Sequence, residues 1–196
     1  NRMSDADTSL VTLPSGTELS FASVAKGCAA KYAAQAMAGA GVTSAIISLG
    51  GNVRTLGLRP DGSNWNVAVQ DPENTNSYVG ILSVGETAVV TSGGYQRYFV
   101  ASNGTTYQHI INPSTGRPAD TDLLSVTIVC EDGTMADALS TALYVLGESG
   151  AKSYYETYGT DFDMVLVTDD GRIIVSGGLT DAFEAYGDRT VEYVRR

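Results

Sequence analysis

The hydrophobic and polar positions of this chain switch between a helical spacing and the alternation of β-strands. Residues 24–37 are rich in alanine with lysine and glutamine between them, and glycines follow, which predicts a helix. Residues 134–146 predict a second helix, because leucines up to Leu146 recur at helical spacing and Gly147 lies just beyond. A third helix is expected after residue 149 and towards residue 158.

Short apolar segments bounded by turn-forming residues make up most of the remaining chain. Residues 45–49 indicate a buried strand that runs into Gly50 and Gly51, where the backbone can approach a neighbour or ligand closely. Residues 163–168 and 172–175 flank an Asp-Asp-Gly turn and predict a terminal hairpin. Further strands are expected at residues 53–58, 65–69, 78–84, 87–91, 97–101, 107–111 and 124–130. Their turn-rich spacing favours antiparallel pairing, so the predicted fold class is α+β.

Length and charge narrow the classes of function. The chain has 196 residues, with 12 Lys and Arg against 22 Asp and Glu and a formal net charge of -10. This charge disfavours nonspecific binding to nucleic acid or to anionic lipid. No apolar run reaches about 18 residues, so no membrane-spanning segment is expected. Cys28 and Cys130 show no metal-ligand spacing, and either buried thiols or one disulfide would account for them.

The only histidine, His109, lies between strand-like residues and a tight turn. Residues 107–111 alternate as a half-buried strand, and residues 112–118 are rich in turn formers. His109 is therefore the leading candidate for a general base at neutral pH. A single histidine is nevertheless more often structural than catalytic, so its surroundings decide between the two interpretations.

Three other groups of residues can carry chemistry. Asp137 and Thr141 lie one helical turn apart, so a carboxylate and a hydroxyl share a face that can hold a hard cation such as Mg²⁺. An ordinary polar helix face explains this pair as well. Lys26 beside Gly27 offers a cation that a phosphate can approach, or else a solvated helix lysine. Residues 91–95 form a hydroxyl-bearing glycine turn that suits backbone contact with an anionic or planar ligand, or a plain hairpin loop.

Taken in order, these segments resemble the ApbE family of flavin transferases, also called FAD:protein FMN transferases. The family's elements are of the types GIAKGYA, NLGGD or NLGGN, TSGxYxRxF, HIIDPxTGxP, SVTV and ADALSTAL. The matching segments here are SVAKGCAA at 23–30, SLGGN at 48–52, TSGGYQRYF at 91–99, HIINPSTGRP at 109–118, SVTIV at 125–129 and ADALSTAL at 136–143. Because the order is kept along almost the whole chain, the resemblance is specific.

The resemblance implies a two-lobed α+β fold, with a mainly antiparallel sheet and a few packed helices. Its cleft would bind FAD with Mg²⁺ and move FMN onto a threonine of an acceptor redox protein, releasing AMP. By the same resemblance His109 would be the base, and Lys26 would support the phosphates. The metal would be held by Asp137, Thr141 and the backbone carbonyl of Ser23. The residues that would border FAD are Ser20, Gly50, Gly51, Ser92, Gly93 and Ile111.

Several positions depart from the family pattern. Family members usually have Asp where Ser20 stands, an aromatic residue at Cys28, an acid at Lys31 and Asp at Asn112. The position of Ser20 is thought to touch FAD, whereas Asn112 keeps the turn chemistry of Asp. Family chains also usually have a further N-terminal region that helps to hold the adenine side of FAD. Residues 1–196 would then form one ApbE-like domain, the C-terminal two thirds of a transferase.

The resemblance also bears on location and on alternative functions. Family members typically act outside the cytoplasm, as lipoproteins or exported enzymes, which implies an extracytoplasmic protein. Residues 1–7 are polar and carry no signal peptide, as expected of a mature or trimmed product. The acceptor is expected to be a separate protein. Two other functions stay open: a pyrophosphatase that splits FAD into FMN and AMP, and a non-catalytic flavin-binding module.

Overall fold

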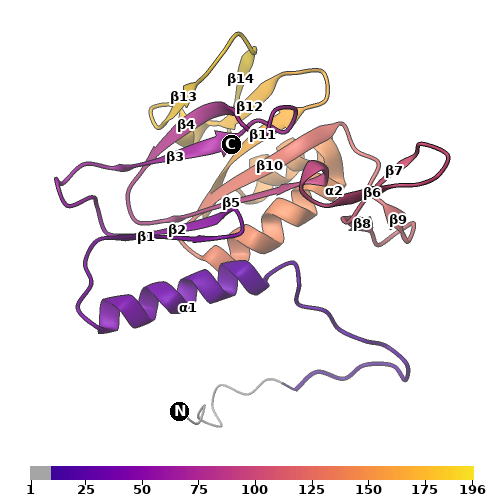
Figure 1. Ribbon diagram of the computed structural model, residues 1–196, viewed down its shortest axis with the longest axis horizontal. Helices are drawn as coiled ribbons and strands as arrows, with labels where there is room; N and C mark the ends of the chain where they lie inside the picture. The colour runs from indigo at the N-terminus through magenta and orange to yellow at the C-terminus, as the bar shows by residue number, and fades with distance from the viewer. Residues whose placement is uncertain (1–9) are drawn as a thin grey trace.

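In the computed structural model, which describes residues 10–196, the chain is organised around a seven-stranded sheet (Figure 1). Neighbouring strands of this sheet pair antiparallel except for the last pair, β12 and β14, which is parallel. The α+β class with a mainly antiparallel sheet is therefore confirmed. The polar residues 1–7 lie outside the described part of the chain. The strands are, in spatial order, β1 (Ala45–Leu49), β2 (Asn52–Leu56), β5 (Ala88–Gly93), β10 (Leu123–Cys130), β11 (Phe162–Thr168), β12 (Ile173–Ser176) and β14 (Val191–Val194).

Both faces of the large sheet are covered (Figure 1). Two helices, α1 (Ala25–Gly39) and α2 (Gly133–Tyr158), lie on one face. A three-stranded sheet covers the other face, in the order β13 (Phe183–Ala185), β4 (Tyr78–Val84) and β3 (Trp65–Gln70). The first predicted helix is thus confirmed to within two residues at each end.

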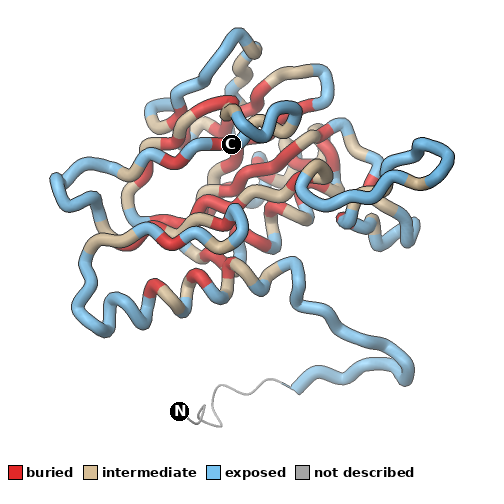
Figure 2. The backbone as a smooth tube through the Cα atoms, viewed as in Figure 1, coloured by how far each residue is buried: buried red, intermediate tan, exposed pale blue. Residues whose placement is uncertain are grey.

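Strand alternation supplies a core to each face of the large sheet. On β11, Met164 and Leu166 pack into the core shared with α2, whereas Val165 and Val167 pack into the core between the two sheets. All four side chains are fully buried, because successive residues of a strand point to opposite faces. Figure 2 shows the buried positions concentrated along the large sheet.

Helix α2 consists of two helical segments separated by a break. Gly147 has φ 74° and ψ -179°, which is not a helical conformation. The predicted second and third helices are therefore the two segments of α2, before and after this break. Leu146, the last of the leucines at helical spacing, is 53% exposed. The buried stripe instead recurs every three or four residues through Ala136, Ser140, Leu143, Gly147, Ala151 and Tyr155.

Two small antiparallel ribbons project beside α2 (Figure 1). The first joins β6 (Tyr98–Val100) to β7 (Thr106–Gln108), and the second joins β8 (Ile111–Asn112) to β9 (Arg117–Pro118). The prediction of one strand over 107–111 is therefore wrong. The chain leaves the first ribbon because Ile110 turns into the core beside α2, where its carbonyl accepts from the Ala119 N–H at 2.8 Å.

The sequence left two states open for the cysteines, and the structure decides between them. Cys28 and Cys130 are both free thiols. Burial raises the pKa of the Cys130 thiol above its usual value. No helix within residues 10–196 is both long and apolar enough to cross a membrane, in agreement with the sequence.

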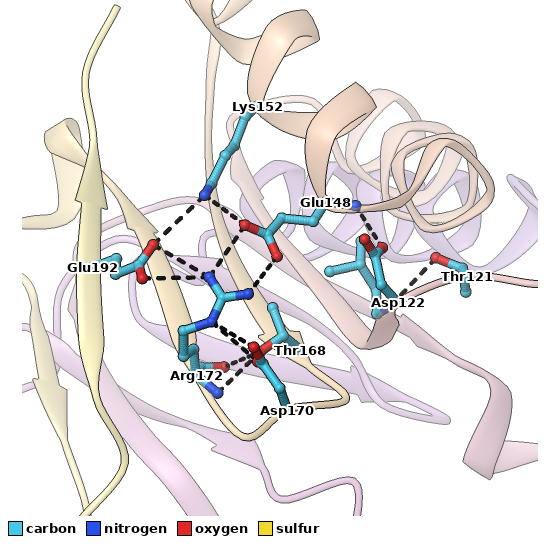
Figure 3. Close-up of polar contacts among 9 residues, drawn as sticks. Thr121, Asp122, Glu148, Lys152, Thr168, Asp170, Arg172 and Glu192 are labelled. Carbon is cyan, nitrogen blue, oxygen red and sulfur yellow. Dashed lines mark hydrogen bonds and ion pairs between the residues drawn. The ribbon is translucent and has the colours of Figure 1, made fainter.

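A charged network ties the second segment of α2 to the large sheet (Figure 3). Arg172 Nη2 donates to Glu148 Oε2 at 2.7 Å, and Lys152 Nζ lies 2.6 Å from Glu148 Oε1. Asp122 accepts from the Glu148 backbone N–H at 2.8 Å, where the helix resumes after its break. Hydrogen bonds from Arg172 and Lys152 hold the pKa of Glu148 below its ordinary value of 4.5.

We expect Glu148→Gln to lower the thermal unfolding midpoint by a few degrees at pH 7, because the charge that attracts both cations is lost. The folded-state pKa lies below 4.5, so the ion pairs contribute stability above that pH and lose it as the pH falls through the folded-state value. Calorimetry across pH measures the difference. Glu156→Gln, at an exposed position on the same helix, is the control. If Glu148→Gln still lowered the unfolding midpoint by the same amount at about pH 3, the ion pairs of Glu148 would not be the cause.

Candidate active site

A cavity of about 920 Å³ brings together segments that lie far apart in the sequence. It opens between the N-terminus of α1, the turn from β1 to β2, the end of β5, the segment after β7 and the first turns of α2. Its volume lies near the upper end of the range of about 300–1,000 Å³ typical of small-molecule sites. The predicted site residues that line it are Ser23, Lys26, Gly50, Gly51, Ser92, His109, Ile111, Asp137 and Thr141.

The two helices meet at the cavity wall through a glycine. The backbone N–H of Gly27 donates to Asp137 Oδ2 at 2.8 Å. A side chain on Gly27 would clash with the carbonyl oxygen of Gly133 and would lie 2.8 Å from the Cβ of Asp137. The sequence interpretation of Gly27 as a place for phosphate to approach is therefore replaced by a packing requirement. The crossing holds Asp137 in place with only 3% of the residue exposed.

The same crossing leaves oxygen atoms free to bind a cation. In a regular helix start the Gly27 N–H would donate to the carbonyl of Ser23, four residues earlier. Because it donates to Asp137 instead, that carbonyl accepts no hydrogen bond within residues 10–196. Asp137 Oδ1 likewise has no partner among the described residues. Ser23 is exposed and lines the cavity.

Hydroxyl groups from β5 and α2 complete this oxygen-rich wall. Ser92 Oγ lies 2.8 Å from Ser140 Oγ and 3.2 Å from Thr141 Oγ1. Residues 10–196 contain no cluster of three or more His, Cys, Asp or Glu suited to a metal. A donor set of one carboxylate, hydroxyls and a carbonyl fits Mg²⁺, which keeps water or substrate phosphate in its shell, and does not fit a soft metal.

The ring of His109 is held in one orientation at the cavity edge. The carbonyl oxygen of Arg97 accepts from the His109 backbone N–H at 3.1 Å and lies 3.0 Å from Nδ1. A carbonyl can only accept, so the proton of the neutral ring is on Nδ1 and Nε2 keeps its lone pair. His109 is exposed and lines the cavity. These surroundings suit a general base rather than a structural histidine.

The cavity carries positive charge although the chain as a whole is acidic. Lys26 and Arg97 both line it, and neither forms an ion pair with another described residue. Gly50 and Gly51, with φ of 57° and 92°, form a turn that a residue with a side chain would strain, and this turn lies against the Lys26 stem. Two unpaired cations in a partly enclosed site favour an anionic ligand such as a phosphate ester.

Two predicted site residues do not line the cavity. Ser20 is exposed in the segment before α1, and its Oγ accepts a hydrogen bond only from the Ala22 N–H, at 3.4 Å. Gly93 is buried at the end of β5, where a Cβ would lie 2.5 Å from the Tyr95 ring and 2.8 Å from the Leu124 carbonyl oxygen. The residues 91–95 are also less of a turn than expected, because β5 continues to Gly93 and pairs there with β10.

Several residues that line the cavity have no role predicted from the sequence. Tyr95 Oη donates to Gln70 Oε1 at 3.2 Å, and burial raises the pKa of Tyr95, so this phenol stays protonated at neutral pH. Tyr95 belongs to the TSGGYQRYF segment, which could have pointed to it and to its neighbours Gln96 and Arg97. Gln70, the last residue of β3, and Thr75, in the connection from β3 to β4, lie in contrast outside any motif.

The chain is similar to a family of flavin-handling proteins. It matches the model described as the ApbE family over residues 2–166. A FAD:protein FMN transferase from Treponema pallidum is 37% identical over 186 residues, covering 90% of this chain and 51% of that protein. One from Vibrio cholerae is 34% identical over 152 residues, covering 77% and 45%. The chain thus spans about half the length of these curated relatives.

Solved structures share the fold. A crystal structure of the ApbE protein from Thermotoga maritima matches with a TM-score of 0.78 and 34% identity, covering 86% of this chain and 54% of that one. The flavin transferase ApbE from Vibrio cholerae matches with a TM-score of 0.68 and 31% identity, covering 82% and 51%.

Proposed function

Because this chain belongs to the ApbE family, we propose that it transfers FMN from FAD to a threonine hydroxyl of an acceptor protein and releases AMP. The observation that carries the proposal is the position of His109, whose Nε2 is left as a proton acceptor beside the oxygen-rich wall around Asp137. The names of the relatives, FAD:protein FMN transferase, support flavin transfer.

In the proposed reaction His109 activates the acceptor. The threonine Oγ–H gives its proton to His109 Nε2 while Oγ attacks the phosphorus on the FMN side of the pyrophosphate. The bond between that phosphorus and the bridging oxygen breaks, and AMP leaves with the bridging oxygen. A phosphoester then joins FMN to the threonine. Lys26 and Arg97 line the same cavity and would hold the phosphoryl oxygens.

The residues that would hold Mg²⁺ are Asp137, Thr141 and Ser23 through its backbone carbonyl. This assignment is supported by Asp137 Oδ1 and the Ser23 carbonyl oxygen, which have no hydrogen-bond partner among residues 10–196. When bound there, Mg²⁺ would neutralise charge that develops on the phosphoryl oxygens.

The flavin would lie along the remaining walls of the cavity. We assign its contacts to the Gly50-Gly51 turn, to Ser92 and to Ile111, all of which line the cavity. Ile111 is 49% exposed, so an apolar surface is available for a flavin ring to cover. Ser20 and Gly93 belong to the same proposal on the family resemblance alone.

Transfer is tested by incubating the chain with FAD, Mg²⁺ and a degenerate library of threonine-containing peptides. We expect peptides that carry covalent FMN, one AMP for each labelled peptide, and loss of both products when EDTA removes the metal. FAD binding without any AMP would contradict transfer and indicate a flavin-binding module without turnover.

Hydrolysis of FAD to FMN and AMP is the second candidate, because His109 is exposed and water can reach its Nε2. The two activities differ in their dependence on the acceptor. AMP released at equal rates with and without the peptide library would favour hydrolysis, whereas a rate that rises with peptide concentration supports transfer.

We also propose that the protein acts outside the cytoplasm. The support is the resemblance to a family whose members are typically exported enzymes or lipoproteins. Fractionation of the native cells with an antibody against the chain tests this placement, and a purely cytoplasmic signal would contradict it.

A further inference from the structure

We propose that one face of the β6–β7 ribbon, formed by Phe99 and Tyr107, docks an extended apolar segment of the acceptor polypeptide beside the threonine that receives FMN. This inference rests on the proposed function, since it concerns the second substrate of that reaction. It assigns a surface outside the cavity described above, because neither aromatic residue lines that cavity.

The register of the ribbon puts the two aromatic residues on the same face as His109. Phe99 pairs with Tyr107 across the two strands. The ladder continues by one pair, because the backbone N–H of His109 donates to the carbonyl of Arg97. Side chains two residues apart on a strand share a face, so Phe99 and Tyr107 share theirs with Arg97 and His109.

On the aromatic face, Phe99 is exposed and Tyr107 is partly buried within the described chain. Phe99 is 64% exposed, and its only aromatic neighbour there is Tyr107, with ring centroids 5.1 Å apart and planes at 16°. Figure 2 shows the ribbon as one of the exposed parts of the molecule. Adjacent Tyr98 and Val100 point to the opposite face, into a groove of about 490 Å³ that also contains Tyr144. The ribbon therefore has two distinguishable faces.

The reaction fixes where an acceptor must pass. Its threonine oxygen has to reach His109 Nε2, and Tyr107 lies two strand residues away, about 7 Å along the ribbon. Acceptor residues about two positions from the threonine would therefore lie over the stacked rings. A flat aromatic pair of this kind binds apolar side chains at little cost in side-chain entropy.

The backbone and the charge of the ribbon indicate further which acceptor segment can bind there. Among residues 10–196, β6 and β7 pair only with each other, so each has an outer edge at which an extended peptide can add as a strand. Arg97 on the same face and Arg117 on the neighbouring ribbon are exposed and have no ion pair with another described residue. Charge complementarity thus favours a neutral or acidic segment over a basic one.

The ribbon offers a matched pair of substitutions on adjacent residues. Phe99→Ala removes a ring from the docking face, and Tyr98→Ala removes one from the opposite face at a similar exposure of 59%. Both variants should fold, because the truncated side chains are mostly in solvent, and the unfolding midpoint checks this. A peptide chosen from the labelled members of the threonine library serves as the acceptor.

We expect Phe99→Ala to raise the KM for this peptide by about 10-fold, with the FAD Kd unchanged. Peptides labelled by the unmodified chain should be enriched in apolar residues near the threonine, and Phe99→Ala should lose this enrichment. Tyr98→Ala should keep the unmodified peptide KM and the enrichment. Phe99→Tyr, which preserves the ring, should also keep both.

The outcomes separate the two proposals. Labelling by the unmodified chain with an equal peptide KM in Phe99→Ala would overturn the docking face and leave FMN transfer in place. Equal losses in Phe99→Ala and Tyr98→Ala would also overturn it, because the effect would then not depend on which face of the ribbon is truncated. Absence of any labelled peptide from the unmodified chain would overturn the proposed function itself and the docking face with it.

Discussion

Replacing His109 with glutamine is expected to lower the rate of FMN transfer by about 10²–10⁴-fold, the contribution of a positioned general base. Glutamine cannot take the threonine proton at neutral pH, whereas Nε2 of His109 is held free for it by the bond between Nδ1 and the Arg97 carbonyl. Because His109 is exposed, the substitution leaves no buried cavity. Steady-state release of AMP in the presence of a labelled acceptor peptide measures the loss.

The controls for this variant separate chemistry from binding and folding. The FAD Kd, from flavin fluorescence, and the unfolding midpoint should match those of the unmodified chain. Ser114→Ala, in the exposed turn between β8 and β9, should keep full activity. An His109→Gln chain that transfers FMN at the unmodified rate would show that another group removes the proton.

Asp137→Asn is expected to have the second large effect, a fall in transfer of about 10²-fold or more, together with loss of Mg²⁺-dependent FAD binding. The amide oxygen can still accept from the Gly27 N–H, so the crossing of α1 and α2 should survive. What disappears is the negative charge that a divalent cation requires. Calorimetric titration with FAD, with and without Mg²⁺, measures this change independently of turnover.

Two further variants test whether Asp137 itself holds the Mg²⁺. Asp181→Asn, at an exposed position outside the cavity, should retain the Mg²⁺ dependence. Asp137→Ala should lose the dependence and also unfold at a lower temperature, because the buried Gly27 N–H then lacks its acceptor. If Asp137→Asn binds FAD with the Mg²⁺ dependence of the unmodified chain, the metal is held elsewhere.

The regular parts of the fold were predictable because their signals are local. The alanine-rich stretch gave α1 to within two residues, and the glycine at 147 marked the break in α2. The strands β13 and β14 were not predicted, because each is short and their positions depend on pairing with β4 and β12. The split of the 107–111 segment also needed tertiary information, namely the core that draws Ile110 inward.

The candidate site shows the same division between local and tertiary information. The order of the family-like motifs identified cavity residues that lie far apart in the sequence, such as Lys26 and Thr141. Their spacing alone was explained equally well by surface residues. The free carbonyl of Ser23 became visible only when the Gly27 N–H was seen to bind Asp137. Gln70 reaches the cavity through the packing of the smaller sheet, which no motif encodes.

The central claim is that His109 and the oxygen-rich wall around Asp137 serve covalent transfer of FMN. The most direct measurement is the mass of a threonine-containing peptide after incubation with the chain, FAD and Mg²⁺, with AMP quantified in the same sample. We predict a peptide that has gained FMN and one AMP per labelled peptide, with neither product in His109→Gln above the background rate. AMP without labelled peptide, or equal labelling by His109→Gln, would contradict the claim.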